Sequence, residues 1–287
     1  MKLTKKMQSA LVMDKNIGLF KCPICSVEME IEEQSRLVCK NLHSFDVAKS
    51  GYVNLAPQAH STKYDKSLFE ARTAVMNSGF FGPVLENIIV RLDNHLTGVE
   101  CPVILDAGCG EGTHLQAVHS RMPVGSVSIG IDLAKEGIVA ASKAYPGIIW
   151  NVADLAAMPF ADSSVDAILN ILSPANYAEF NRLLKPGSIV VKVVPESGYL
   201  QELREAFYDG KQQKEEADPV ERFREQFDAV ETEPVTYTFA LPEDLLAPLI
   251  RMTPLTWNAR EERVREVLAT GMKEITIDLR VISGVRR

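Results

Sequence analysis

The fold of this chain is decided by the stretch Asp106-Ala107-Gly108-Cys109-Gly110-Glu111-Gly112. It follows a short apolar run at 103–105 and precedes a helical pattern that starts at Thr113. Glycines let the backbone turn sharply and approach a ligand whose charge or dipole is received at a helix N-terminus. The stretch therefore predicts a ligand-binding loop between a buried strand and a helix.

The spacing of the glycines separates this loop from two common nucleotide-binding loops. A dinucleotide fingerprint, G-x-G-x-x-G, would require glycine at the position of Thr113. A phosphate loop would require G-K-S or G-K-T, which does not follow. The pattern is instead D-x-G-x-G-x-G.

Two further acids follow the next two expected strands. Asp132 ends the strand 127–131, where a carboxylate can accept both hydroxyls of a ribose, and Asp154 follows the strand 148–152, where it can reach an adenine amino group. The carboxyl ends of successive parallel strands meet in one crevice, so Asp106, Asp132 and Asp154 are expected to converge. We expect the adjacent leucines to line the same site, namely Leu133 and Leu155.

Strand and helix patterns alternate throughout residues 103–194, which predicts βαβ units around a parallel sheet. Two helices are expected before this region, and a strand, two helices and a last strand after it. Expected strands are 103–105, 127–131, 148–152, 165–169, 188–194, 235–239 and 274–281. Expected helices are 69–76, 83–96, one from 113, one through 144, 175–184, 242–251 and 258–269, with an exposed helix or insertion in 211–225.

The N-terminal part contains a metal-binding pattern, C-x2-C-x13-C-x3-H. Two close pairs of ligands can form two tight turns that converge on a tetrahedron, the geometry that suits Zn²⁺. All four positions are filled by protein, so the predicted metal is structural and stabilises a segment with too little apolar material for its own core. The predicted ligands are Cys22, Cys25, Cys39 and His43.

Composition and charge exclude several classes of protein. The 287 residues are 46% hydrophobic with a formal net charge of −7, which excludes disorder and a protein that coats nucleic acid by charge alone. Residues 1–66 carry ten basic and seven acidic side chains, so the N-terminal part is positive and the remainder negative. The metal-binding segment therefore either binds nucleic acid through Lys21, Lys40 and Lys49 or only stabilises the fold of the domain.

We expect three parts in the chain: a zinc-binding ribbon at 1–55, a linker with two helices at 56–98, and the α/β domain at 99–287. The linker 56–68 is polar and carries His60 and Lys63. No apolar run approaches the roughly 18 residues of a membrane span, and the first twenty residues contain no compact apolar h-region followed by a small-residue cleavage site. We therefore expect a cytoplasmic protein.

The glycine loop and the two later acids resemble those of class I S-adenosylmethionine-dependent methyltransferases. The resemblance covers residues 103–195 and includes Leu184-Lys185-Pro186-Gly187 before the fifth strand. It implies a Rossmann-like, doubly wound sheet and S-adenosylmethionine as the cofactor. The alternative is a Rossmann-like fold that binds another nucleotide or no ligand at all.

From residue 20 onward the chain is similar to the 23S rRNA (guanine-N1)-methyltransferases, in the Gram-positive branch associated with tylosin-type macrolide resistance. The matching motifs are H-x-F-D-x-A-x-x-G-Y-V-N-L from His43, Ser173-Pro174-Ala175-Asn176, and Lys192-Val193-Val194-Pro195. The resemblance implies a guanine in a 23S rRNA stem-loop as substrate, zinc in the ribbon and a homodimer.

Residue roles carry over from the resemblance. In the loop the cofactor positions are Gly110 and Glu111. The motif A-R-x-A-x-x-x-x-G, which ends at Gly79, places a third cofactor position at Phe81. A fourth falls at Tyr199, directly before Leu200. Other members can have tyrosine at the first of these aromatic positions and histidine at the second, and aromatic packing is the alternative for both. The target pocket is expected at Asn170, Pro174 and Asn176, with Glu111 or water accepting the proton.

Two other functions compete with this interpretation. A non-catalytic RNA-binding or sensor protein could keep the fold, although the complete set of loop glycines and acids argues against it. A small-molecule methyltransferase is the second alternative, and the positive, zinc-binding N-terminal part argues against that one.

Overall fold

The computed structural model describes residues 3–58, 64–208 and 218–287. Most of its strands form one large sheet: β4 (Val53–Asn54), β5 (Val103–Ala107), β6 (Val127–Asp132), β7 (Ile149–Val152), β8 (Val165–Ile171), β9 (Leu184–Pro195), β10 (Asp228–Ala240) and β11 (Glu274–Val285). Their order is β10-β11-β9-β8-β5-β6-β7-β4. All neighbours from β9 to β4 are parallel, and β11 is antiparallel to both β9 and β10.

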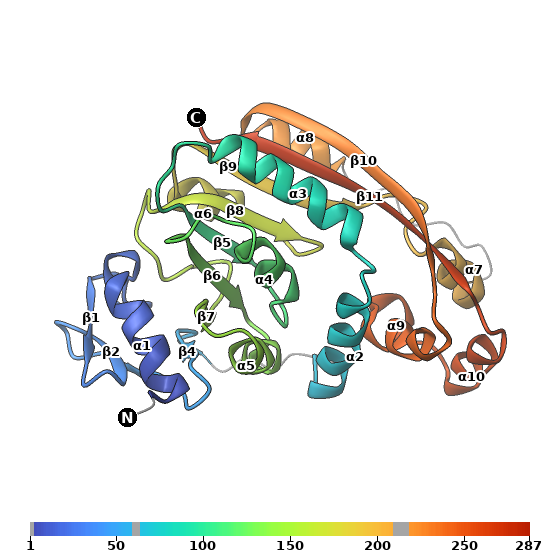
Figure 1. The fold of residues 1–287 in the computed structure, drawn as a ribbon, viewed down its shortest axis with the longest axis horizontal. Coiled ribbons are helices and arrows are strands. Elements are labelled where there is room, and N and C mark those ends of the chain that lie inside the picture. The colour runs from blue at the N-terminus through green and yellow to red at the C-terminus, as the bar shows by residue number, and fades with distance from the viewer. Residues whose placement is uncertain (1–2, 59–63, 209–217) are drawn as a thin grey trace.

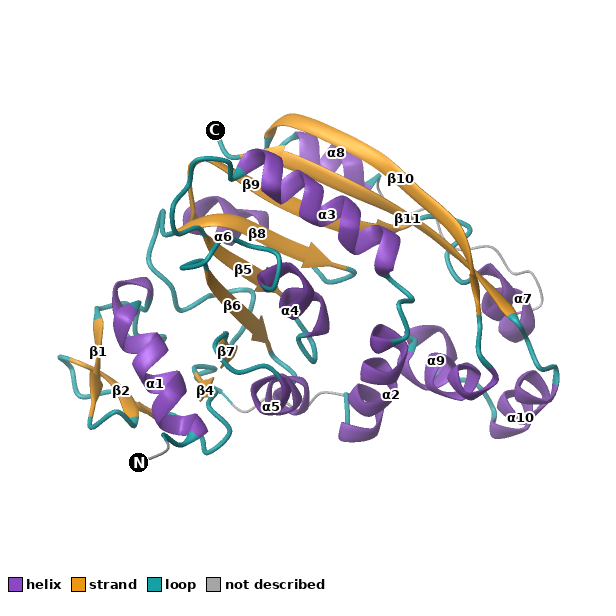
Figure 2. Cartoon of the chain, viewed as in Figure 1, coloured by secondary structure: helices purple, strands orange, loops and turns teal. Residues whose placement is uncertain are grey.

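Helices cover both faces of this sheet (Figures 1 and 2). The helices are α1 (Lys5–Lys15), α2 (Lys66–Asn77), α3 (Gly82–His95), α4 (Thr113–His119), α5 (Lys135–Ala144), α6 (Tyr177–Leu183), α7 (Gln201–Tyr208), α8 (Pro219–Arg224), α9 (Leu246–Met252) and α10 (Glu261–Ala269). Apolar side chains of α3, α4 and α5 share one core with the sheet, and those of α1, α6 and α8 share the core on the other face. None of the described helices combines the length and the apolar character needed to cross a bilayer.

The central strands form because their sequences are apolar on both faces. Every residue of β8 is buried, as are all residues of β5 and β7. Strands of this kind belong in the middle of a parallel sheet that helices cover on both sides. The predicted α/β, doubly wound fold is confirmed, and the expected strands of 103–194 are all present.

The C-terminal strands β10 and β11 form an antiparallel pair, and both strands are longer than the sequence pattern predicts. Its far end carries α9 and α10, which are the two helices expected in this region (Figure 1). Of the segment 211–225, the structure describes residues 218–225. Most of these residues form α8, whose Val220 and Phe223 are buried. This part is a helix packed on the sheet, while 211–217 lies outside the described residues.

A small three-stranded sheet forms the N-terminal ribbon: β1 (Met29–Glu32), β2 (Arg36–Cys39) and β3 (Ser44–Asp46). The preceding α1 was not predicted. Its N-cap is Thr4, whose hydroxyl accepts a hydrogen bond from the Met7 N–H, and its Ala10 and Met13 are fully buried. β4 lies within the segment expected to be ribbon, yet it pairs with β7 at the edge of the large sheet.

The expected linker is shorter than its sequence suggests. Asp65 caps α2 by accepting a hydrogen bond from the Leu68 N–H at 2.8 Å, so the helix begins at Lys66 instead of residue 69. The linker residues His60 and Lys63 lie outside the described residues.

Candidate cofactor site, target turn and zinc centre

The glycine loop joins β5 to α4 and has left-handed backbone conformations at Gly108, with φ of 90°, and Gly112, with φ of 82°. An ideal Cβ at Gly112 would lie 2.4 Å from the Trp150 ring, and one at Gly108 would lie 1.9 Å from Ser173 Oγ. The loop therefore packs so closely against its neighbours that side chains at these positions would displace them.

Asp132 at the end of β6 holds the loop in place. Its Oδ2 accepts a hydrogen bond from the Gly110 N–H at 2.9 Å, and its Oδ1 accepts one from the Ala134 N–H at 2.8 Å. Each carboxylate oxygen can accept a second hydrogen bond, so the group retains capacity for ribose hydroxyls. The neighbouring Leu133 is half-buried at the same sheet edge.

Asp106 is buried, and its Oδ1 has no hydrogen-bond partner among the described residues. Desolvation raises its pKa to about 8; the charge of Arg72 opposes this, and the charges of Asp132 and Glu111 add to it. A buried carboxyl group with an unused oxygen beside two other acids suits a ligand that brings a cationic amino group. This observation fits the aminoacyl end of S-adenosylmethionine.

Arg72 of α2 was not predicted to be part of the site. Its Nε lies 2.5 Å from Oε2 of Glu111, which is 2% exposed. The pairing brings α2 against the glycine loop, because the guanidinium is also the nearest group to an ideal Cβ at Gly110, at 3.4 Å. Arg72 lies in the A-R-x-A motif that located Phe81, so the sequence contained this signal. The ion pair with Arg72 also engages the carboxylate of Glu111, which is one of the two proton acceptors expected from the sequence.

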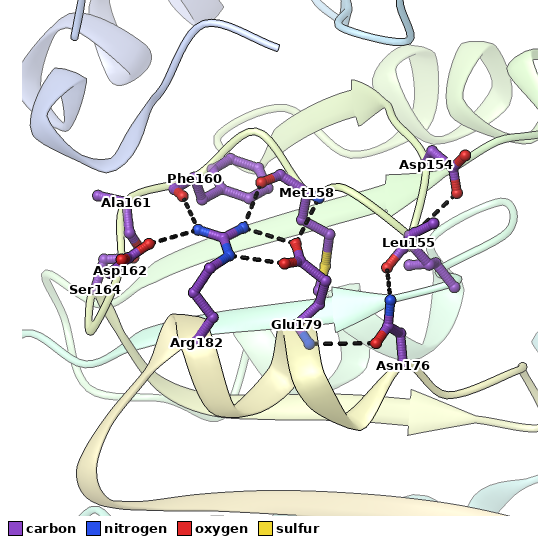
Figure 3. Close-up of polar contacts among 11 residues, drawn as sticks. Asp154, Leu155, Met158, Phe160, Ala161, Asp162, Ser164, Asn176, Glu179 and Arg182 are labelled. Atoms are coloured by element: carbon purple, nitrogen blue, oxygen red, sulfur yellow. Dashed lines mark hydrogen bonds and ion pairs between the residues drawn. The ribbon is translucent and has the colours of Figure 1, made fainter. Parts of the chain in front are cut away.

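The loop after β7 carries Asp154 and Leu155, and α6 holds it from the other side (Figure 3). Asp154 Oδ1 accepts a hydrogen bond from the Ala156 N–H at 2.8 Å, which forms a tight turn. Asn176 donates from Nδ2 to the Leu155 carbonyl at 3.3 Å and caps α6 by accepting from the Glu179 N–H at 3.3 Å. Asn176 thus joins the expected adenine side of the site to the expected target side.

The two transferred aromatic residues lie behind the loop. Phe81 is buried and meets the His114 ring edge to face with centroids 5.1 Å apart, and His114 lies in the first turn of α4. Burial raises the pKa of Tyr199 above its usual range, and the charge of Arg72 opposes this shift. Both rings therefore belong to the environment of the loop, on the side where Arg72 enters.

The turn after β8 contains the expected target-side residues. Asn170 is fully buried, and its Nδ2 donates to the carbonyls of Ala107, at 2.9 Å, and Pro174, at 3.0 Å. Its Oδ1 accepts from Lys192 Nζ at 2.5 Å, and the same ammonium donates to the Ser173 carbonyl at 3.1 Å. Asn170 therefore shapes the turn that presents Ser173 and Pro174.

Lys192 also shapes this turn, a role that the motif Lys192-Val193-Val194-Pro195 does not by itself predict. It pairs with Asn170 in the parallel ladder of β8 and β9. Burial and, as the smaller cause, the charge of Arg222 together lower its pKa to about 8. No carboxylate lies within ion-pair distance of its ammonium in the part of the chain that the structure describes. Only neutral carbonyl groups compensate the buried charge.

The four predicted zinc ligands come together in the ribbon. Their ligand atoms all lie within 4.8 Å of one another. The Sγ atoms of Cys25 and Cys39 are 3.7 Å apart, and His43 Nδ1 lies 3.3 to 3.5 Å from the three sulfur atoms. A tetrahedral zinc ion with bonds of about 2.0 to 2.3 Å has ligand separations of about 3.5 to 3.8 Å. The donor set therefore fits a closed, structural zinc site.

Together, the strand order, the glycine loop after β5 and the acids after β5, β6 and β7 define a class I S-adenosylmethionine-dependent methyltransferase with an N-terminal zinc ribbon. Two family models match these parts separately. The model described as "RlmA, N-terminal", a zinc ribbon, matches residues 20–63, and a methyltransferase domain model matches residues 104–187.

Full-length relatives narrow the class. The Bacillus subtilis (strain 168) protein named "Putative 23S rRNA (guanine-N(1)-)-methyltransferase YxjB" is 38% identical over 94% of this chain and 98% of that protein. The "23S rRNA (guanine(748)-N(1))-methyltransferase" of Streptomyces fradiae is 28% identical over 93% of this chain and 97% of that protein. The chain belongs to the 23S rRNA (guanine-N1)-methyltransferase family.

A solved structure supports the fold alone. The putative methyltransferase from an antibiotic biosynthesis pathway of Anabaena variabilis ATCC 29413 is 17% identical, with a TM-score of 0.52. The match covers 69% of this chain and 96% of that chain. The likeness concerns the methyltransferase architecture.

Proposed function

We propose that this chain transfers a methyl group from S-adenosylmethionine to N1 of a guanine in a 23S rRNA stem-loop. The observation that carries the proposal is that a relative named as a 23S rRNA (guanine-N1)-methyltransferase matches 94% of this chain, a span that includes both its zinc ribbon and its methyltransferase domain. The complete acid and glycine set argues against a non-catalytic sensor. The positive, zinc-binding N-terminal part argues against a small-molecule substrate.

We propose the following cofactor contacts. Asp132 receives the ribose hydroxyls, and Asp154 with Leu155 receives the adenine. The buried, unpaired oxygen of Asp106 accepts from the amino group of the aminoacyl end. The backbone of 108–112 surrounds the same end, and Leu133, Phe81 and Tyr199 shape the walls. The bound cofactor supplies a methyl group on a sulfonium, which is displaced in line by nitrogen.

The chain's own contribution is positioning. Methyl transfer requires the attacking nitrogen and the methyl carbon to lie a little over 3 Å apart on one line. Ser173 contacts the loop at Gly108, so the target turn and the cofactor loop are held at a fixed separation. Guanine N1 lies on the Watson–Crick edge, and the base must therefore leave its helix to reach Pro174. Asn170 and Asn176 hold the turn from behind.

Loss of the N1 proton requires an acceptor. Oε2 of Glu111 is held by Arg72 at 2.5 Å and is buried, so it is not free to accept. Asn170 and Asn176 cannot hold an additional proton. We therefore propose that water takes the proton as the nitrogen–carbon bond forms and the sulfur–carbon bond breaks.

Replacing Lys192 by methionine is expected to change the pH dependence of stability. The pKa of Lys192 is about 8 in the folded state against an ordinary value of 10.5, so the unfolded chain binds more protons between these pH values. The free energy of unfolding of the wild type therefore gains with pH across that window, relative to the variant. Urea unfolding of both proteins at several pH values measures this difference.

Lys185→Met is the matched control for Lys192→Met. Lys185 lies at the opposite end of β9, where its ammonium pairs with Asp166 at 2.8 Å. We expect Lys192→Met to lower kcat about tenfold, because the target turn loses two charged hydrogen bonds, and Lys185→Met to leave kcat unchanged. Equal effects of the two variants on kcat would contradict a role of Lys192 in the turn.

Methylation of rRNA is expected to weaken steeply with salt. Lysine and arginine contacts to phosphates release counterions, so kcat/KM for rRNA should fall at least about tenfold from about 50 to about 200 mM salt. Binding of S-adenosylhomocysteine, which carries no phosphate, should change little and serves as the control. A flat profile for rRNA would argue against an RNA substrate.

We further propose that the chain acts in the cytoplasm and as a homodimer. The resemblance to the family supports both proposals, and rRNA is a cytoplasmic substrate in bacteria. Light scattering of the full chain should give about twice the 31.7 kDa mass of one chain. The parts at 1–55, 56–98 and 99–287 are proposed as the functional division, with β4 of the first part completing the sheet of the third.

A further inference from the structure

The segment 154–162 lies between the zinc ribbon and the proposed adenine site. Its first residues, Asp154 and Leu155, belong to the proposed cofactor site. Its residues 159–161 pair with residues 19–21, which lead into the first zinc ligand. We call this segment the bridging segment. Its two ends therefore contact two parts of the protein with different ligands.

The ribbon end of the bridging segment is fixed by backbone pairing. The Lys21 N–H donates to the Pro159 carbonyl at 3.0 Å, and the Ala161 N–H donates to the Leu19 carbonyl at 2.9 Å. The rings of Phe20 and Phe160 pack with centroids 5.6 Å apart, and both are fully buried. Since Cys22 follows directly, the first zinc ligand lies one residue from this pairing.

A single arginine holds the middle of the bridging segment (Figure 3). Arg182 of α6 donates to the carbonyls of Met158, at 2.7 Å, and Phe160, at 2.8 Å. It also donates to the Asp162 carboxylate at 2.7 Å and to both carboxylate oxygens of Glu179 at 2.7 to 2.8 Å. All of these groups depend on the planar guanidinium, which no other cationic side chain reproduces.

The same helix holds the cofactor end. Glu179 accepts from the Met158 N–H at 2.8 Å, and Asn176 donates to the Leu155 carbonyl. The side chains of Asn176, Glu179 and Arg182 lie on one face of α6 along the bridging segment (Figure 3). Hydrogen-bonded groups therefore connect the ribbon end of the bridging segment to Leu155 through α6.

We infer that Arg182 is a positioning residue that couples the zinc ribbon to the cofactor site, so that the folded ribbon increases the affinity for S-adenosylmethionine. The inference rests on the proposed function, because it takes Asp154 and Leu155 as adenine contacts. With zinc bound, the ribbon fixes 159–161, Arg182 transmits this to α6, and the adenine loop stays in its binding conformation. Without zinc or without Arg182, the loop is less ordered before binding.

The test is a thermodynamic cycle on the full chain, with S-adenosylhomocysteine as the probe in isothermal titration. The wild type is measured zinc-loaded and after zinc removal by a chelator, and Arg182→Met is measured in the same two states. We expect zinc removal from the wild type to weaken binding about tenfold, and Arg182→Met with zinc to weaken it by a similar factor. Zinc removal from Arg182→Met should then add nothing.

Arg224→Met is the matched control variant. Arg224 forms an ion pair with Glu221 three residues earlier at 2.7 Å, the same spacing and distance as Arg182 and Glu179, but on α8 away from the bridging segment. Its binding and its response to zinc should equal those of the wild type. Arg182→Lys should recover part of the affinity, because a lysine ammonium can satisfy only some of the acceptors.

If Arg182→Met fails to fold by circular dichroism, Glu179→Gln replaces it in the cycle, since it keeps the shape and removes the charge. The inference is overturned if zinc removal leaves wild-type affinity unchanged, if Arg182→Met binds as the wild type does, or if the two losses multiply. A wild type that binds no S-adenosylhomocysteine in either state overturns the proposed function as well, so the two failures are distinguishable.

Discussion

Alanine at position 108 is expected to lower kcat for methyl transfer at least about 100-fold, with a smaller change in KM for rRNA. An ideal Cβ there would lie 1.9 Å from Ser173 Oγ and 2.7 Å from its Cβ, so the target turn must move away from the cofactor loop. A displacement of about 1 Å between reacting groups costs about 100-fold in rate. Steady-state kinetics with a 23S rRNA fragment measures both constants.

Gly147→Ala separates this contact from backbone strain. Gly147 has φ of 92°, almost the same as the 90° of Gly108, but nothing lies within 4 Å of its ideal Cβ. The Gly147→Ala variant should be less stable than the wild type and should keep its kcat. The double variant Gly108→Ala with Ser173→Gly should recover part of the activity because the clash is removed. The account of the turn is wrong if Gly147→Ala loses as much activity as Gly108→Ala.

Cys39→Ser is expected to release zinc and unfold residues 20–45, the second large effect. Structural zinc contributes apparent binding free energies of about 10 to 16 kcal/mol, and the ribbon has little core to replace it. Metal analysis should find less than stoichiometric zinc. Hydrogen exchange should show loss of protection in β1 and β2, while β5 and β8 stay protected.

Cys101→Ser provides the control, because Cys101 is exposed and far along the chain from the ribbon. It should bind zinc as the wild type does. Cofactor binding to Cys39→Ser should remain measurable, and its affinity should be weakened by the same factor as zinc removal weakens that of the wild type. A Cys39→Ser protein with stoichiometric zinc would show that the ligand assignment is wrong.

Local motifs explain which parts were predictable. The ligands Cys22, Cys25, Cys39 and His43 sit in two short turns, so their spacing alone fixes how they converge. The glycine loop is also a local feature, because its three glycines allow left-handed backbone conformations within seven consecutive residues. Asp132 and Asp154 could be placed because the carboxyl ends of parallel strands share one edge.

Contacts between distant segments were not predictable from these motifs. Arg72 reaches Glu111 from a helix that precedes the sheet, and Arg182 reaches residues more than twenty positions earlier. Nothing in the sequence of α1 names β7 as the element that it packs against, since the contact joins segments more than 130 residues apart and only Ala10 and Met13 of the helix are buried. β4 is two residues long and becomes a strand only because β7 offers an open edge.

These contacts suggest why the two parts occur together over the whole length of the relatives. Residues 1–66 carry a net positive charge, and the large domain contributes the chemistry. Their interface is built from backbone pairing at 19–21 and 159–161 and from the buried Phe20 and Phe160. A connection of this kind holds the ribbon in a fixed relation to the methyltransferase domain.

Methyl transfer to N1 of a guanine can be observed by incubating the protein with labelled S-adenosylmethionine and protein-free 23S rRNA, followed by primer extension across the hairpin loops of the RNA. N1-methylguanine cannot pair with cytosine, so reverse transcription stops beside it. The account predicts incorporation into RNA and a single new stop at a guanine in a loop. Absence of incorporation, with S-adenosylhomocysteine still bound by the protein, would contradict it.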